Sequence, residues 1–187
     1  MDLQKINFKI FSQIHQPTPL WTFVEIFNRW IQDSQVDDIL IDVADYTHVF
    51  QGPGVILVAY QANYAMDETD GRLGFLYDQK RSRSNEDGFI HAYRKAVQCC
   101  SLLESDPQLR GKITFSPSHF SVWINDRLEA PNDYEHQMKL EKLIKNFSKQ
   151  LFPNDTFQWS GEEDPRKRCG FEVQCNRPFN YSEVLGQ

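Results

Sequence analysis

The feature that most constrains this chain is a set of three stretches in which apolar side chains recur at helical spacing. The stretches cover residues 18–34, 84–106 and 132–152, and each opens on a residue that caps helices well, namely Thr18, Ser84 and Asn132. Each stretch therefore predicts a helix with one apolar face. Such a helix has to bury that face against another layer, so a second layer of secondary structure is required.

Short segments rich in β-forming residues supply that second layer. The expected strands are 6–11, 39–46, 55–60, 73–77, 112–115, 119–124, about 156–160 and 169–175. The order of elements predicts an α+β fold, a two-layer, mainly antiparallel sheet of six to eight strands with three helices on one face. The tail, residues 177–187, has no regular pattern and is expected to be irregular.

The length of the chain, 187 residues, favours a single domain over 1–187. Helix starts at 84 and 132, each followed by a pair of expected strands, suggest two helix–hairpin units, 84–128 and 132–176. The residues of the two units do not match, so the similarity is only one of element order.

Composition and charge narrow the class of protein. Hydrophobic residues make up 40% and charged residues 25% of the chain, and no apolar run approaches the ~20 residues of a membrane-spanning helix. The formal net charge is −6, and residues 1–70 hold 3 basic against 10 acidic side chains. This acidic segment disfavours nucleic acid and suits a basic partner or a cation, unless it is simply a solvated surface.

The spacing of the cysteines and the absence of the known short motifs argue against a metal or a nucleotide cofactor. Cys99, Cys100, Cys169 and Cys175 include no C-x-x-C pair, and they are expected to be buried thiols of a cytosolic protein. The chain contains no P-loop, no G-x-G-x-x-G and no calcium loop with ligands at the required positions. We therefore expect no cofactor and no metal.

A cluster of cations is the first candidate binding site. Lys80, Arg81 and Arg83 directly precede the expected helix start at Ser84, and Arg72 precedes them on a neighbouring strand. The N–H groups at a helix N-terminus attract anions, and neighbouring cations strengthen the attraction. The competing interpretation is a set of surface ion pairs with the acidic residues of the first helical turn.

A second candidate element is the loop Gly52-Pro53-Gly54, which joins two apolar strands and follows His48. Two glycines allow the backbone of such a loop to approach a ligand closely. A structural turn explains the same residues equally well. For nucleophilic catalysis there is no G-x-S-x-G motif, and His119, between Ser118 and Phe120, is expected to be a surface residue.

Three short segments resemble uncharacterised bacterial proteins. They run from His48 through Gly52-Pro53-Gly54-Val55, over Gly71-Arg72-Leu73-Gly74, and from Tyr77 to Lys80-Arg81. The resemblance implies a bacterial cytosolic protein and transfers no functional residue.

Two functions from different classes follow. The first is a non-catalytic binding or adaptor protein of the cytosol, which contacts another protein or a copy of itself without touching a membrane. The second is a small-molecule or phosphate-ligand site, enzymatic or regulatory, between the 52–54 loop and the 80–84 segment. A third hypothesis, nucleic-acid binding through Arg166-Lys167-Arg168, is disfavoured by the acidic residues of the same loop.

Overall fold

The computed structural model describes residues 5–80 and 86–186. The strands are β1 (Ile6–Ile14), β2 (Leu40–Asp45), β3 (Val55–Ala59), β4 (Ala62–Asp67), β5 (Gly74–Gln79), β6 (Ile113–Ile124), β7 (Phe157–Gly161) and β8 (Gly170–Cys175). The helices are α1 (Trp21–Asp33), α2 (Glu86–Ser105), α3 (Tyr134–Leu151) and α4 (Tyr181–Leu185), with a 3-10 turn, η1 (Thr69–Gly71), between β4 and β5.

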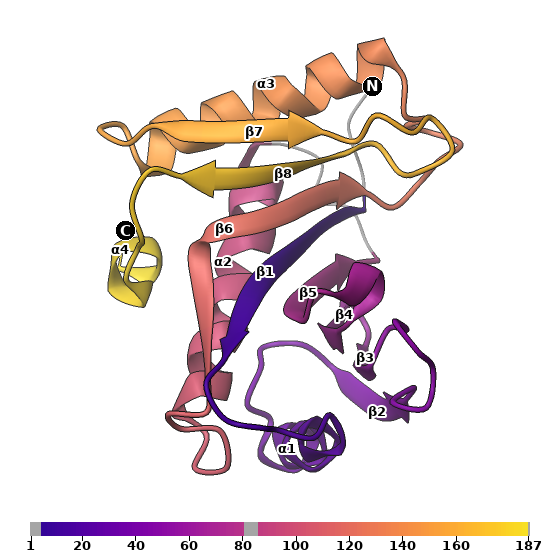
Figure 1. Cartoon of the computed structure of the whole chain (residues 1–187), viewed down its shortest axis with the longest axis vertical. Helices are drawn as coiled ribbons and strands as arrows, with labels where there is room; N and C mark the ends of the chain where they lie inside the picture. Colours follow the sequence, from indigo (N-terminus) through magenta and orange to yellow (C-terminus); the bar gives the residue numbers. More distant parts are fainter. Residues whose placement is uncertain (1–4, 81–85, 187) are drawn as a thin grey trace.

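The strands form one eight-stranded antiparallel sheet in the order β2-β3-β4-β5-β1-β6-β8-β7. The three long helices pack on one face of it, α1 on β2 and β3, α2 on β1, β5 and β6, and α3 on β8. Figure 1 shows α2 crossing behind β1 and β6. The predicted α+β architecture is therefore confirmed.

A group of aromatic rings joins the helices to the sheet. Tyr93 of α2 lies 4.8 Å from Phe147 of α3 and 5.2 Å from Phe120 of β6, measured between ring centroids. Phe8 of β1 lies 4.9 Å from Phe89 of α2, with the two rings nearly perpendicular. Edge-to-face pairs of this kind contribute about 0.5–1.5 kcal/mol each beyond the burial of their surface. These rings belong to one continuous core.

Side chains alternate between the two faces of every strand, and those on the face opposite the helices are largely polar. On β1, Phe8 and Ile10 enter the core, while Lys9 and Phe11 point to the polar face. Lys9 is only 5% exposed, and its Nζ lies 2.5 Å from Oδ2 of Asp67 on β4. Its stem passes over Gly74, where a Cβ atom would lie 3.1 Å from Lys9 Cγ.

Two helix starts differ from the prediction. Helix α1 begins at Trp21 after a Leu20 cap that makes no side-chain bond, so Thr18 is not the N-cap. The N-cap of α3 is Asp133, whose side chain accepts a hydrogen bond from the His136 N–H. The neighbouring Asn132 instead donates to two carbonyls of the β7–β8 loop. The Ser84 cap of the second helix lies outside the described residues.

Two features of the predicted strands and the prediction for the tail also need correction. Residues 62–67 form β4, although a Tyr60-Gln61 turn without glycine or proline gave no signal that a hairpin was present. The expected strands 112–115 and 119–124 are one strand, β6, with an irregular register between them. Helix α4 occupies part of the tail that was expected to be irregular, and a capping box of Asn180 and Glu183 starts it.

A substitution in the buried Lys9–Asp67 ion pair tests how much this pair stabilises the polar face of the sheet. In Lys9→Met the carboxylate of Asp67 loses its cation while it stays buried, so we expect the free energy of unfolding to fall by about 3 kcal/mol in urea denaturation. Lys5→Met is the matched control, because the Lys5–Asp126 pair is partly exposed and should cost less than about 1 kcal/mol. Equal losses in the two variants would contradict the burial of Lys9.

Candidate functional site

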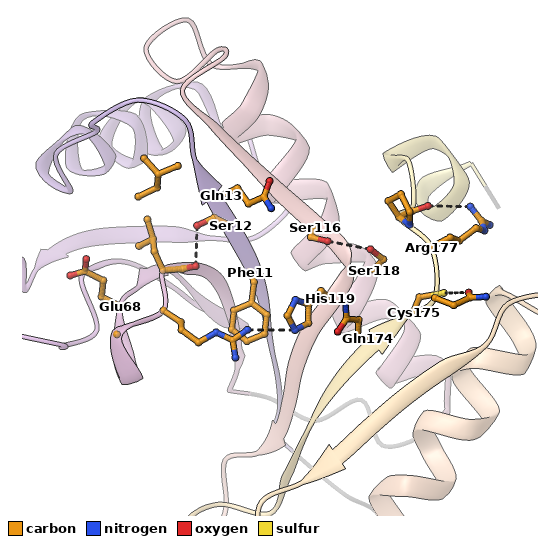
Figure 2. A pocket seen from close by; sticks show the side chains of 16 residues that line it. Phe11, Ser12, Gln13, Glu68, Ser116, Ser118, His119, Gln174, Cys175 and Arg177 are labelled. Carbon is orange, nitrogen blue, oxygen red and sulfur yellow. Dashed lines mark hydrogen bonds between the residues drawn. The ribbon is translucent and has the colours of Figure 1, made fainter.

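A cavity of about 730 Å³ opens on the polar face of the sheet. Its walls come from the end of β1, the η1–β5 connection, the first half of β6, and the segment that follows β8. Figure 2 shows Phe11 and His119 at its centre, with Glu68 and Arg177 toward opposite ends. Four segments that lie far apart in the sequence therefore meet at one hollow.

The hollow arises where the pairing of β1 with β6 is interrupted. Ile10 is opposite Phe120, but Ser12 is opposite Phe115, so β6 carries extra residues between these two points. Pro117 lies in this stretch and has no N–H to offer to a ladder, which is why prolines within sheets occur at bulges. From the core side, the Tyr93 hydroxyl donates to the Pro117 carbonyl at 2.8 Å. The bulge is thus anchored to α2.

Arg72 extends across the floor of the cavity. Its Cζ atom lies 3.6 Å from the centroid of the Phe11 ring, a cation–π contact. Its Nη1 donates to Oε2 of Glu172 on β8 at 2.8 Å, and its Nη2 lies 3.4 Å from Nε2 of His119. One side chain from the η1–β5 connection therefore contacts β1, β6 and β8.

His119 and Glu172 form an oriented pair beside Arg72. Nε2 of His119 lies 2.6 Å from Oε1 of Glu172, and an ionised carboxylate can only accept, so Nε2 carries the proton. In a neutral ring this leaves Nδ1 as an acceptor. Burial raises the pKa of Glu172, but the hydrogen bonds and charges of Arg72 and His119 outweigh it and hold that pKa below its usual value.

Uncharged polar side chains supply much of the remaining lining. The hydroxyls of Ser116 and Ser118 lie 3.2 Å apart, and the Ser12 hydroxyl donates to the Leu73 carbonyl at 2.9 Å. The amides of Gln13 and Gln174 are exposed and form no side-chain hydrogen bond within residues 5–80 and 86–186. Both amides can donate to and accept from a bound molecule.

The cationic side chains of the cavity are already paired. Arg72 has its partner in Glu172, and Arg177 binds both carboxylate oxygens of Asp155, at 2.7 and 2.9 Å. Glu68, by contrast, makes no side-chain hydrogen bond or ion pair with any described residue. The lining therefore carries no surplus of positive charge. No group of three or more His, Cys, Asp or Glu side chains suited to a metal occurs in the described part of the chain.

Of the predicted ligand-binding residues, Arg72 lies in the cavity, whereas His48, Gly52 and Gly54 lie in the neighbouring β2–β3 loop. His48 is exposed and stacks on Tyr46 at 6.5 Å. The Gly52 carbonyl accepts from the Glu68 N–H at 3.3 Å, and Gly54 packs against the end of β4. This loop therefore adjoins the cavity but does not line it.

Lys80 lies at the other end of β3. Its Nζ donates to the Ala59 carbonyl at 2.7 Å, whereas Gly54 immediately precedes the first residue of the same strand. The structure thus does not bring Lys80 and the 52–54 loop together. Arg81 and Arg83 lie outside the described residues, and the predicted site between the two segments stays a prediction.

His119, Glu172 and the two serines of the bulge were not among the residues that sequence reasoning selected. The available signal was Pro117, flanked by Ser116 and Ser118 inside a segment of strand-like residues. Glu172 gave no signal of its own, because its contacts depend on the pairing of β8 with β6.

Comparison with known proteins adds no relationship, because no family model matches the chain and no curated protein is similar to it. Among the described residues, no helix has both the length and the apolar character needed to cross a membrane. The assignment of a function therefore rests on the geometry of the cavity.

A substitution at Gly54 tests whether this glycine is required for the fold of the β2–β3 loop. At φ +64° a side chain is strained, and a Cβ atom there would lie 2.0 Å from the Met66 carbonyl oxygen. We expect Gly54→Ala to lower the free energy of unfolding by about 3 kcal/mol or more. Gly111→Ala is the control, since Gly111 also has a positive φ but nothing lies within 4 Å, and strain alone costs about 1–2 kcal/mol.

The Glu172 carboxylate gives a pH-dependent test. Because its folded-state pKa lies below the ordinary value of about 4.3, its contribution is present above that pH and is lost as the pH falls through the folded pKa. We expect wild type to exceed Glu172→Gln by less than about 1 kcal/mol between about pH 5 and 7, since the group is partly exposed. Urea denaturation should show this difference shrinking below about pH 4. A difference that grows in acid would contradict the assignment.

Proposed function

We propose that this chain is a binding protein whose cavity takes a small, uncharged molecule rich in hydroxyl groups. The observation that carries the proposal is the lining itself: hydroxyls and free amides face a hollow whose cations are already paired. Hydroxyl groups of a ligand both donate and accept hydrogen bonds, as do serine hydroxyls and, between their two ends, glutamine amides.

The size of the cavity agrees with this ligand class. A volume of about 730 Å³ falls within the range of about 300–1,000 Å³ found for small-molecule sites. Its polar lining matches a ligand whose own surface is polar, because each buried hydroxyl then finds a partner. A large apolar ligand would leave the lining groups without partners.

A phosphate ligand, the alternative from the cation cluster, has less support. To bind a dianion, Arg72 would have to give up part of its interaction with Glu172, and Arg177 part of its interaction with Asp155 and Glu183. The unpaired Glu68 carboxylate would also repel it. Arg72 retains further N–H donors, so an anion remains the second ligand class to be tested.

Binding is favoured over catalysis by the way the serines are engaged. Ser116 and Ser118 share a hydrogen bond with each other, and neither hydroxyl has a hydrogen bond to His119 among the described residues. A serine nucleophile needs an adjacent base to activate it. We therefore assign these hydroxyls to ligand recognition.

We also place the protein in a reducing compartment such as the bacterial cytosol. All four cysteines are free and buried. Burial raises the pKa of Cys99 to about 12 and that of Cys169 to about 11, so these thiols stay protonated and unreactive near neutral pH.

The experiment is a thermal-shift and calorimetric screen of the full chain. Neutral monosaccharides, disaccharides and polyols form one arm, and inorganic phosphate with sugar phosphates forms the other. A ligand present at 100 times its Kd stabilises a protein by about 2.7 kcal/mol, which raises the melting temperature by several degrees. We expect the neutral arm to contain such a ligand.

Two variants locate the binding. Gln174→Ala should weaken the neutral ligand by about five- to tenfold, the equivalent of one lost hydrogen bond. Gln158→Ala is the control, because Gln158 is the exposed cross-strand neighbour of Gln174 on β7 but does not line the cavity. A shift only with phosphate that disappears in Arg72→Ala would replace our proposal with an anion site. No shift in either arm would refute both.

A further inference from the structure

The loop between β2 and β3 carries exposed apolar side chains on its outer surface. Phe50 is 89% exposed, Val49 41% and Tyr46 40%. We define the loop surface as these three residues together with the neighbouring carboxylates of Asp45, Glu68 and Asp70. A single exposed apolar residue is ordinary, but three exposed apolar side chains on one short loop are typical of a contact surface.

The loop is held in place by hydrogen bonds rather than collapsed onto the core. The Tyr46 N–H donates to the Gly54 carbonyl at 2.8 Å, and the Gly52 N–H donates to the Val49 carbonyl at 3.0 Å. Asp45 accepts from the Thr47 N–H at 2.8 Å, and this backbone bond lowers the pKa of its carboxyl. A fixed loop presents Phe50 without the ordering cost that a mobile one would add to binding.

The charged side chains of the loop surface itself are three carboxylates. The side chains of Asp45, Glu68 and Asp70 make no ion pair with any residue in the described ranges. The sequence has no Lys or Arg between Arg29 and Arg72. Arg72 itself is turned toward Glu172 across the sheet. Lys167 acts on Asp70 and His48 acts on Asp45 through charge alone, so none of the three carboxylates is neutralised by an ion pair among the described residues.

The adjacent edge strand β2 is protected against strand addition. The Tyr46 N–H bonds to Gly54, directly before β3. The alternation of an antiparallel ladder therefore turns the Val43 N–H to the outer edge. There the Val43 N–H donates to the Asp42 side chain at 2.8 Å. A partner strand would have to displace this bond, so a partner of this region contacts side chains rather than the strand edge.

We infer that the loop surface docks a basic protein segment that carries apolar side chains. Phe50 would supply the apolar anchor, and the three carboxylates would face the partner's Lys or Arg side chains. A second copy of this chain would bring like charges together, and an anionic membrane would be repelled in the same way. This inference is independent of the ligand proposed for the cavity.

The test measures the binding of labelled synthetic peptides to the full chain by fluorescence anisotropy. One peptide combines Lys with Leu, a second replaces each Lys by Glu, and a third replaces each Leu by Ser. We expect the Lys/Leu peptide alone to bind, with an affinity that falls as salt is added. Phe50→Ser and Asp70→Asn should each weaken it by about tenfold or more. Asp70→Asn is chosen over a change at Glu68 because Glu68 also lines the cavity, and asparagine accepts the φ of +63° at this position.

The control is Leu128→Ser, which removes a side chain that is 95% exposed but lies outside the loop surface. Its affinity for the Lys/Leu peptide should equal that of wild type. The inference is overturned if no peptide binds, if the Glu/Leu peptide binds as well as the Lys/Leu peptide, or if Phe50→Ser and Leu128→Ser behave alike. Dimerisation in sedimentation that depends on Phe50, or binding to anionic lipid vesicles, would also overturn it.

Discussion

Tyr93 connects the core of this protein to its cavity. Its ring packs against Phe120 and Phe147, which joins α2 to both β6 and α3. Its hydroxyl donates to the Pro117 carbonyl, at the point where β6 leaves its register with β1. Burial raises its pKa well above the usual value, so the hydroxyl keeps the proton that it donates. The same residue therefore supports the packing of the helices and the bulge that opens the cavity.

The two faces of the sheet differ in polarity and in what covers them. One face is covered by three helices and is filled with apolar side chains. The other carries Lys9, Asp67 and the Arg72–Glu172–His119 group, and it has to satisfy its polar atoms through side-chain pairs. Because these pairs cross from strand to strand, they hold together the strands that carry the free amides and hydroxyls of the cavity. The ligand recognition that we propose and the stability of the sheet thus depend on the same contacts.

Local patterns in the sequence were sufficient for the α+β class and for most of its elements, although β4 gave no signal. The apolar stripes of 18–34 and 132–152 correspond to α1 and α3, and the expected strand 169–175 corresponds to β8. The cavity could not be predicted in this way. It depends on a register shift between β1 and β6, strands about a hundred residues apart, and on Glu172 reaching His119 through the pairing of β8. Arg72 was selected for its charge, but its partners are set by tertiary contacts.

Glu104 of α2 binds β6 at Phe115, just before the bulge that Tyr93 binds at Pro117. Its Oε1 accepts from the Phe115 N–H at 2.5 Å and from the Tyr181 hydroxyl, which joins α2 to the start of α4. Tyr93 and Glu104 are separated by about 16 Å of a single helix, at 1.5 Å per residue. Helix α2 therefore holds β6 at two points, Phe115 and Pro117, on either side of Ser116. Two anchors on one helix hold the bulge in its shape, so the ligand that we propose would meet a preformed wall.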